Sequence, residues 1–309
     1  MNQLPELPER DLPPGRHQLL KEHLMTEIRH EKPARGRGKW LRPALAAAAV
    51  ATAAAVTFVA LPSSSSQPGA QPPSRATVAL LEDIALAAEH EPSYGKVRDD
   101  QFVYMDSMVS GSNSDGGKMT TTPLHRLEVW MSVDGLHNGL TREAGQKPVV
   151  TTPYVKPGEE GWDASAFYKH VETLPTDTDG MYDYLAKTAP KYSGQEKYQA
   201  MFVLAGDLLR LSTVPPEQSA ALFRAVARIP GVTLVDDAVD AAGRPGVGVA
   251  RQDPDNPTQD EWIFDRTTYD FLGEREVATD DFSNVKKGAV TANTAVLRRA
   301  IVDKAGERP

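Results

Sequence analysis

The stretch VTLVDDAVDAAGRPGVGVARQDPDNPTQDEWIFDRTTYDFLGEREV, residues 232–277, decides the fold. Four runs rich in Val, Ile, Phe and Trp lie at 232–239, 245–252, 261–268 and 269–277. The turn stretches DAAGR and DPDNPTQD separate the first three, and DRTT at the end of the third run offers a turn into the fourth. β-Branched and aromatic residues favour strands, whereas clusters of Gly, Pro, Asn and Asp favour turns. Because the connections are short, neighbouring strands should pair antiparallel. The stretch therefore predicts an antiparallel meander.

The preceding segment, residues 160–230, changes from a hydrophobic period of two to a period of 3.6, which indicates a helical insertion. A first helix is expected to be capped by Thr178 or Asp179, and Asp177 and Gly180 are also interpreted as part of a helix cap. A second helix is expected to cover about Lys197–Leu211. A third should open with Pro215-Pro216-Glu217, because proline is well tolerated in the first turn of a helix.

Further elements are expected before the helical block. Ser74 is placed to cap a helix that carries Leu81 and Ile84, and QFVYMDSMVS at 101–110 has the composition of a strand. The Ser- and Gly-rich segment SGSNSDGGKMTTT, residues 110–122, is predicted to be a mobile loop.

A hairpin is predicted after this loop. Alternate residues from Leu127 to Val133 are apolar, and Asp134-Gly135 is typical of a tight primed turn, in which positive φ angles are required. The returning strand should run through Leu136–Arg142, and a last strand is expected in 294–302. The predicted fold class is α+β, an antiparallel sheet with a helical insertion.

Residues 43–61, PALAAAAVATAAAVTFVAL, contain no charged side chain and are nineteen residues long. A helix of about 20 residues at 1.5 Å per residue spans a hydrocarbon core of roughly 30 Å. Five Lys and Arg residues lie between Lys32 and Arg42, so the positive-inside rule predicts a cytoplasmic N-terminus. A soluble Ala-rich helix and a cleaved signal peptide are the alternatives. The long preceding segment and the bulky Phe58 before Ala60 favour a retained signal-anchor.

The chain is therefore expected to have four parts: a cytoplasmic basic tail at 1–42, a transmembrane helix at 43–61 in contact with the lipid bilayer, a linker at 62–73 and an extracytoplasmic α+β domain at 74–309. This organisation is that of a single-pass protein of the cell membrane. Within the tail, residues 16–30 form an amphipathic pattern that suits a cytoplasmic protein partner or the inner leaflet. A weakly structured topogenic tail is the alternative.

Charge and cysteine content exclude several classes of function. Residues 1–42 contain nine Lys and Arg and six Asp and Glu, so the net charge of −8 for the chain leaves −11 for the remainder. An acidic outer domain is unsuited to nucleic acid, which requires a basic surface. The chain has no cysteine, which excludes disulfides, thiolate metal sites and lipoprotein attachment.

No catalytic, cofactor-binding or metal-ligating residue is predicted, and no cofactor. GRPGVGVA, from Gly243, lacks the Lys-Ser/Thr of a phosphate loop and predicts a hairpin turn. The acidic residues between Asp253 and Glu261 have the composition, but not the central glycine, of a calcium loop, and predict a solvated turn. His125 and His137 flank the hairpin without a third ligand at recognisable spacing. Carboxylate pairs for hydrolysis remain open, because their pairing would be spatial.

The chain resembles an uncharacterised actinobacterial family of single-pass membrane proteins, often encoded beside extracytoplasmic-function sigma factors. The motifs that carry the resemblance cover nearly the whole chain and are the W-L-R-P approach to the Ala-rich segment, DDQFVYMDS at 99–107, EVWMSVDG at 128–135, ETLPTD at 172–177, VPPEQSAALFRAVARIPGV at 214–232, DAAGRPGVGVA at 240–250, EWIFDRTTYDFLGER at 261–275 and AIVDKAGERP at 300–309. The outer pattern also looks like lipoprotein-carrier and sigma-regulator sensor domains. That likeness implies a curved sheet that holds an apolar ligand.

The leading hypothesis is a non-enzymatic, membrane-anchored sensor or accessory protein of the cell envelope, whose outer domain binds an apolar ligand or a protein partner, with a link to sigma-factor signalling. The alternative is an envelope hydrolase that acts on wall or lipid material. A concave sheet face lined by apolar side chains would favour binding, whereas a polar cleft with converging carboxylates or histidines would favour an enzyme.

Overall fold

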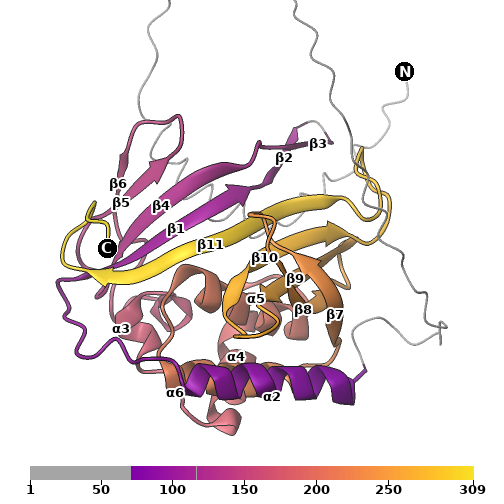
Figure 1. The fold of residues 1–309 in the computed structure, drawn as a ribbon, viewed down its shortest axis with the longest axis horizontal. Helices are drawn as coiled ribbons and strands as arrows, with labels where there is room; N and C mark the ends of the chain where they lie inside the picture. The colour runs from indigo at the N-terminus through magenta and orange to yellow at the C-terminus, as the bar shows by residue number, and fades with distance from the viewer. Residues whose placement is uncertain (1–70, 116) are drawn as a thin grey trace, which may run out of the picture.

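The computed structural model describes residues 71–115 and 117–309 (Figure 1). Its helical elements are α2 (Arg75–Glu89), η1 (Trp162–Ala164), α3 (Tyr168–Val171), α4 (Thr178–Tyr192), α5 (Lys197–Leu211) and α6 (Pro216–Val226). Its strands are β1 (Phe102–Ser110), β2 (Ser112–Asp115), β3 (Lys118–Thr121), β4 (His125–Ser132), β5 (Gly139–Glu143), β6 (Val149–Thr151), β7 (Val232–Val239), β8 (Pro245–Gln252), β9 (Thr258–Phe264), β10 (Phe271–Ala278) and β11 (Val290–Val302).

Three predicted features fall outside this part of the chain: the helix at 16–30, the membrane segment at 43–61 and most of the linker at 62–73. None of the helices within residues 71–115 and 117–309 combines the length and apolar composition that crossing a membrane requires.

Within the described residues, nine strands form one antiparallel sheet in the order β6-β5-β4-β1-β11-β10-β9-β8-β7. The long strand β11 joins the two halves, because it pairs with β1 on one side and with β10 on the other. The sheet is strongly curved, and its helices lie on the concave side (Figure 1). The fold is thus α+β, with the helical block inserted between two groups of strands, as predicted.

The helices bury one face of the β7–β10 half. Phe202 of α5 stacks on Trp262 of β9 with ring centroids 4.0 Å apart, and Phe223 of α6 meets Phe264 edge-on at 5.6 Å. Alternation along β9 puts Trp262 and Phe264 on the same face. All four side chains are buried, so this half has a continuous dry core.

A buried arginine fixes the start of α5. Glu196 caps the helix by accepting two backbone amides of its first turn. Arg251 of β8 donates to Glu196 at 2.7 Å and to the Gln199 side chain at 2.6 Å. Arg251 is 1% exposed, and burial lowers its pKa from the usual range, against the opposing effect of Glu196. These contacts attach the start of α5 to β8.

The opposite, convex face of the β1–β4 half is also covered. Trp130 packs against Tyr104 with ring centroids 5.0 Å apart, and its indole N–H donates to the Glu307 carbonyl. Arg308 pairs with Glu128 at 2.5 Å, and this hydrogen bond is the main cause of the lowered pKa of Glu128. The C-terminal residues therefore close the convex side of β4.

The predicted element types are largely confirmed. The second helix covers Lys197–Leu211, the third begins at Pro216, and the runs 232–239 and 245–252 are β7 and β8. Ser74 caps α2, since its hydroxyl accepts the Thr77 amide at 3.1 Å. The first helix of the block is capped by Asp177, one of the predicted capping residues, whose side chain accepts the Gly180 amide; the other two candidates, Thr178 and Asp179, lie inside the helix.

The tight turn predicted at Asp134-Gly135 was also wrong. β4 and β5 do pair, and Gly135 has φ of +71°, but residues 133–138 lie between the strands. Val133 is 1% exposed and packs with Val103 and Tyr168, so the chain runs on to bury it before turning. The Asp134 carboxylate then stabilises the wider turn by accepting the Leu136 amide.

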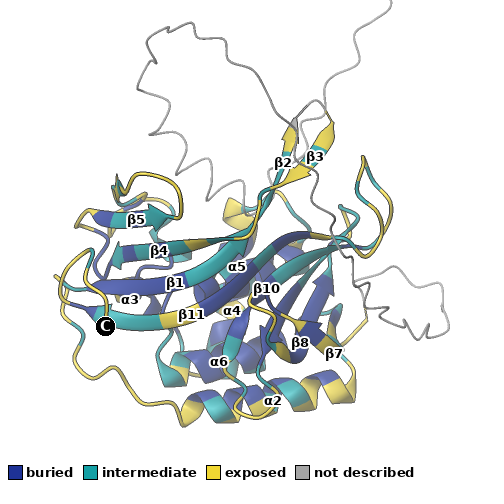
Figure 2. Cartoon of the chain, turned by 45° about the horizontal axis from the view of Figure 1, so that its top comes forward, coloured by how far each residue is buried: buried dark blue, intermediate teal, exposed yellow. Residues whose placement is uncertain are grey.

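Residues 110–122, predicted to be a mobile loop, form the β2–β3 hairpin instead. Most of this hairpin is exposed and projects from the sheet (Figure 2). Its contacts are polar: Asn284 bonds both the amide and the carbonyl of Met119, at 2.7 and 2.9 Å. The hairpin is held by a side chain that is distant in the sequence, and its own residues do not alternate between apolar and polar. It therefore could not be predicted from the local pattern.

Candidate functional site

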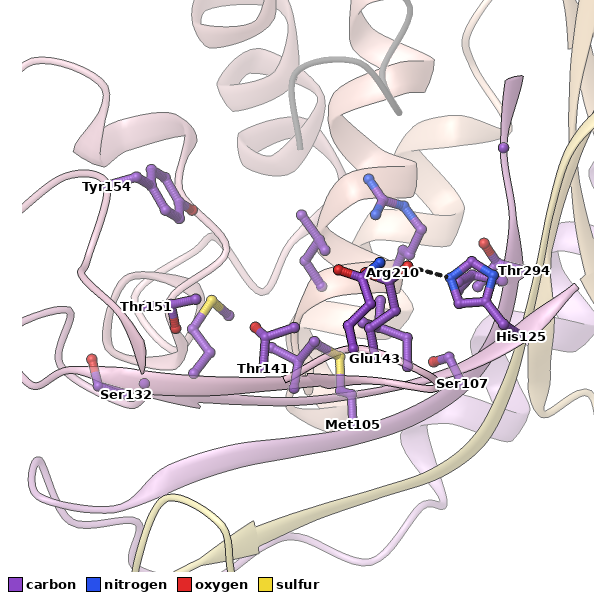
Figure 3. Close-up of a pocket in the computed structure, with 18 of the residues that line it drawn as sticks. Met105, Ser107, His125, Ser132, Thr141, Glu143, Thr151, Tyr154, Arg210 and Thr294 are labelled. Carbon is purple, nitrogen blue, oxygen red and sulfur yellow. Dashed lines mark ion pairs between the residues drawn. The ribbon is translucent and has the colours of Figure 1, made fainter. Parts of the chain in front are cut away.

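A cavity of about 350 Å³ lies on the concave face of the sheet, beyond the end of the helical cover. Strands β1, β4 and β5 form its floor (Figure 3). The end of α5 forms one wall, and residues 151–154 with Phe167 form another. Small-molecule sites span roughly 300–1,000 Å³, so the cavity is large enough for a small ligand.

The floor is apolar because of strand alternation. Antiparallel register puts Met105 beside Val129, and on this face the two strands contribute Met105 and Val109 from β1 and Leu127, Val129 and Met131 from β4. The predicted common face of β4 is thus confirmed. Methionine side chains are flexible and polarisable, which lets them adapt to ligands of irregular shape.

An aromatic stack forms the wall nearest β5. Phe167 stacks on Tyr154 at 4.9 Å and on Trp162 at 5.6 Å between ring centroids. Tyr154 accepts the Ala166 amide, and burial of its hydroxyl raises its pKa to about 12 although 47% of the residue is exposed. Tyr154 is therefore uncharged at neutral pH. Gly135 lies directly behind the stack, where an added Cβ would be 2.7 Å from the Trp162 ring.

Arg210, at the end of α5, supplies a charge that is already compensated. It is 8% exposed and pairs with Glu274 at 2.8 Å and with Asp207 at 2.7 Å. It is also the only Lys or Arg among the described residues that line the cavity. A ligand carboxylate or phosphate would therefore have to compete with two protein carboxylates for this guanidinium.

The rim carries an ion pair between His125 and Glu143. His125 Nε2 lies 3.0 Å from Glu143, and Nδ1 lies 2.7 Å from the Pro123 carbonyl. Both ring nitrogens are engaged, so neither is available to accept a proton from a nucleophile. Figure 3 shows this pair at one end of the cavity.

His137, the second histidine of the predicted hairpin, lines the same cavity but pairs with Asp134 at 3.0 Å. The structure therefore brings His125 and His137 to one cavity, each against a different carboxylate. Over residues 71–115 and 117–309 no group of three or more His, Asp or Glu side chains has the geometry to hold a metal ion.

The remaining motifs serve the fold. Gly243 lies in the β7–β8 turn, where its amide donates to the Asp240 carbonyl, as expected for a hairpin and not for a phosphate loop. Asp253 accepts from the Asp255 amide and the Asn256 side chain, and Glu261 pairs with Arg275 at 2.6 Å. The hairpin turn predicted at Gly243 is confirmed. The solvated turn predicted for the acidic residues is only partly right: the chain turns at residues 254–257, but Glu261 lies in β9, and both Asp253 and Glu261 are buried.

No protein-family model matches the chain, and no curated protein is significantly similar to it in sequence. Among solved structures, it is similar to a chain in the complex structure of MucA and MucB from Pseudomonas aeruginosa. The two share 13% identity over 76% of this chain and 58% of that chain, with a TM-score of 0.26. The match thus spans less than two thirds of that chain, and at this score it says nothing about function.

The resemblance implied a curved sheet that holds an apolar ligand, but the residue pattern did not locate the cavity, although one signal was present. In β1 and β4 apolar residues occur on both faces: Tyr104 and Trp130 on one, Met105 and Val129 on the other. A strand that is apolar on both faces must be covered on both. The sequence does not show that the helices cover only part of the concave face.

Proposed function

We propose that the domain after residue 71 is a non-enzymatic binding module that holds an apolar ligand in the cavity beside the end of α5. The observation that supports it is the row of partly exposed apolar side chains on the concave face, in a half of the sheet where the helices leave space. Burying a ligand methylene contributes about 0.8 kcal/mol, so a short alkyl chain is enough for useful affinity.

The charged groups support binding over chemistry. His125, Glu143 and Arg210 are each held by a partner of opposite charge or by a backbone carbonyl, and such pairs position a ligand without activating a nucleophile. Hydrolysis is the competing outcome of the test below.

The test uses the full chain in lipid nanodiscs and a dodecyl diazirine, which attaches covalently to whatever surrounds it when illuminated. We expect label on peptides from β1, β4 and β5. Val129→Phe fills the centre of the floor and should reduce that label about tenfold, because the inserted ring occupies the space of the ligand. Val150→Phe is the matched control, since Val150 is 60% exposed on β6 outside the cavity.

Label that is equal in both variants would overturn the proposal. If the protein hydrolyses a dodecanoyl ester and Glu143→Gln abolishes that activity, the hydrolase is favoured instead.

We further propose that residues 43–61 anchor this module in the cell membrane with the basic tail in the cytoplasm, as part of an envelope sensor or accessory protein. The support is the uncharged run and the basic residues before it. Residues 16–30 are the segment proposed to meet a cytoplasmic partner. Protease added to intact spheroplasts should digest residues 62–309 and spare the tail, and protection of residues 62–309 would reverse this topology.

A further inference from the structure

Two buried hydroxyls line the cavity without a hydrogen-bond partner among the described residues: Thr141 Oγ1 and Ser132 Oγ. Thr141 is 6% exposed and Ser132 is 1% exposed. Buried hydroxyls in folded proteins almost always have a partner, so two in one cavity require an explanation. Figure 3 shows both on the side of the cavity away from His125.

The position of Thr141 follows from the sheet. Thr141 pairs with Val129 across β4 and β5, and Gly139, Thr141 and Glu143 alternate onto the cavity face. Its hydroxyl is therefore beside the apolar floor, where a ligand that covers Val129 would bring its polar group within reach.

The charges of the cavity restrict what that polar group can be. Arg210 is neutralised by Glu274 and Asp207, and His125 is paired with Glu143. Protein carboxylates already pair with both of these side chains. The anionic head group of a ligand would therefore be buried without a partner of opposite charge, which is strongly unfavourable. An uncharged ester can instead accept a hydrogen bond from a hydroxyl.

Resting on the proposed function, we infer that the ligand is a single-chain neutral lipid, and not a fatty acid or a phospholipid. Its ester carbonyl accepts a hydrogen bond from the Thr141 hydroxyl, and its adjoining polar group bonds Ser132. The chain covers the floor made by Leu127, Val129 and Met131. Thr141 and Ser132 are thus specificity-determining residues.

The test measures competition with the dodecyl diazirine on the full chain in phosphatidylcholine nanodiscs. 1-Monododecanoylglycerol should displace the probe at a concentration at least about fivefold lower than dodecanoate, which has the same chain and a negative charge. Thr141→Val keeps the shape of the side chain and removes its hydroxyl. It should weaken the glyceride about five- to tenfold and leave dodecanoate unchanged, as expected for one lost hydrogen bond. Thr141→Ser retains the hydroxyl and should behave like the wild type.

A second readout separates a ligand contact from a structural role. Without added ligand, Thr141→Val should leave the melting temperature unchanged or raise it, because it removes a buried hydroxyl that has no partner. A lowered melting temperature would assign the hydroxyl to the fold and overturn the inference. Equal displacement by the two competitors, with Val129→Phe still blocking label, would overturn the inference and leave apolar binding intact. If Val129→Phe does not reduce the label, both the inference and the proposed apolar binding are overturned.

Discussion

Both halves of the sheet carry a row of apolar side chains on the concave side, but the row is buried in one half and lines a cavity in the other. In the β7–β10 half, Trp262 and Phe264 are fully buried under α5 and α6. In the β1, β4 and β5 half, Leu127, Val129 and Met131 are only partly buried and line a cavity. The strand pattern is alike in the two halves, so the extent of helical cover decides whether an apolar row becomes a core or a binding surface.

The largest expected effect comes from truncating one side chain in each half. Trp262→Ala should destabilise the protein by about 3–5 kcal/mol, because it removes a buried ring that stacks on Phe202 and leaves a cavity. Leu127→Ala should cost less than about 1 kcal/mol, since Leu127 already faces open space. Urea unfolding of the full chain, followed by circular dichroism, gives both values. Equal losses would show that the cavity half is packed as tightly as the other.

The covered half could be predicted well from the sequence, and the reason is local. β7, β8 and α5 are each defined by residues next to one another: alternating apolar residues, a hairpin turn at Gly243, and a 3.6-residue period over Lys197–Leu211. The turn at Asp265 is local too, because its carboxylate accepts the amides of Thr267 and Thr268. Patterns that act over a few residues are visible in one sequence.

The cavity half could not be predicted because its determinants are distant. β1 pairs with β11 from Phe102↔Val302 onward, and Asn284 holds Met119 in the β2–β3 hairpin. The burial of Val133 under Tyr168 widens the turn that Asp134-Gly135 would otherwise make tight. The cavity depends on where α5 ends relative to β4, because Arg210 and Leu211 at that end line it.

A smaller effect should distinguish backbone strain from the packing of the aromatic wall. Gly135 has φ of +71°, and a Cβ there would lie 2.7 Å from Trp162 and 3.2 Å from Phe167. Gly135→Val should cost about 2–5 kcal/mol, of which the left-handed backbone accounts for about 1–2 and the clash for a further 1–3.

Gly243→Val is the matched control, because Gly243 has φ of +81° with nothing within 4 Å of its Cβ. It should show the backbone cost alone and leave probe labelling of the cavity unchanged, whereas Gly135→Val should lower that labelling by displacing Phe167. Equal destabilisation by the two variants would mean that the wall yields freely to an added side chain.

The smallest expected effect is a dependence of stability on pH that is confined to the cavity half. His170 of α3 lies under the aromatic wall, 8% exposed, with its ring centroid 6.0 Å from that of Trp162 and Nε2 3.3 Å from the Tyr184 hydroxyl. Burial lowers the pKa of His170 below its ordinary value, and nearby Asp163 opposes this only in part. As pH falls through about 6.5, the unfolded chain takes up a proton that the folded protein does not.

Stability must therefore fall with pH from about 6.5 down to the lowered pKa of His170, and level off below it, where both states are protonated. Relative to the intrinsic exchange rate at each pH, amide exchange should accelerate between pH 7 and pH 5.5 in residues 162–171 and stay unchanged in β8 and β9, whose buried face is anchored by Trp262. His170→Gln does not titrate and should remove the acceleration. Acceleration that persists in His170→Gln would place the titrating group elsewhere. Equal acceleration in β8 and β9 would show that acid loosens both halves of the sheet together, so that the cavity wall has no independent response to pH.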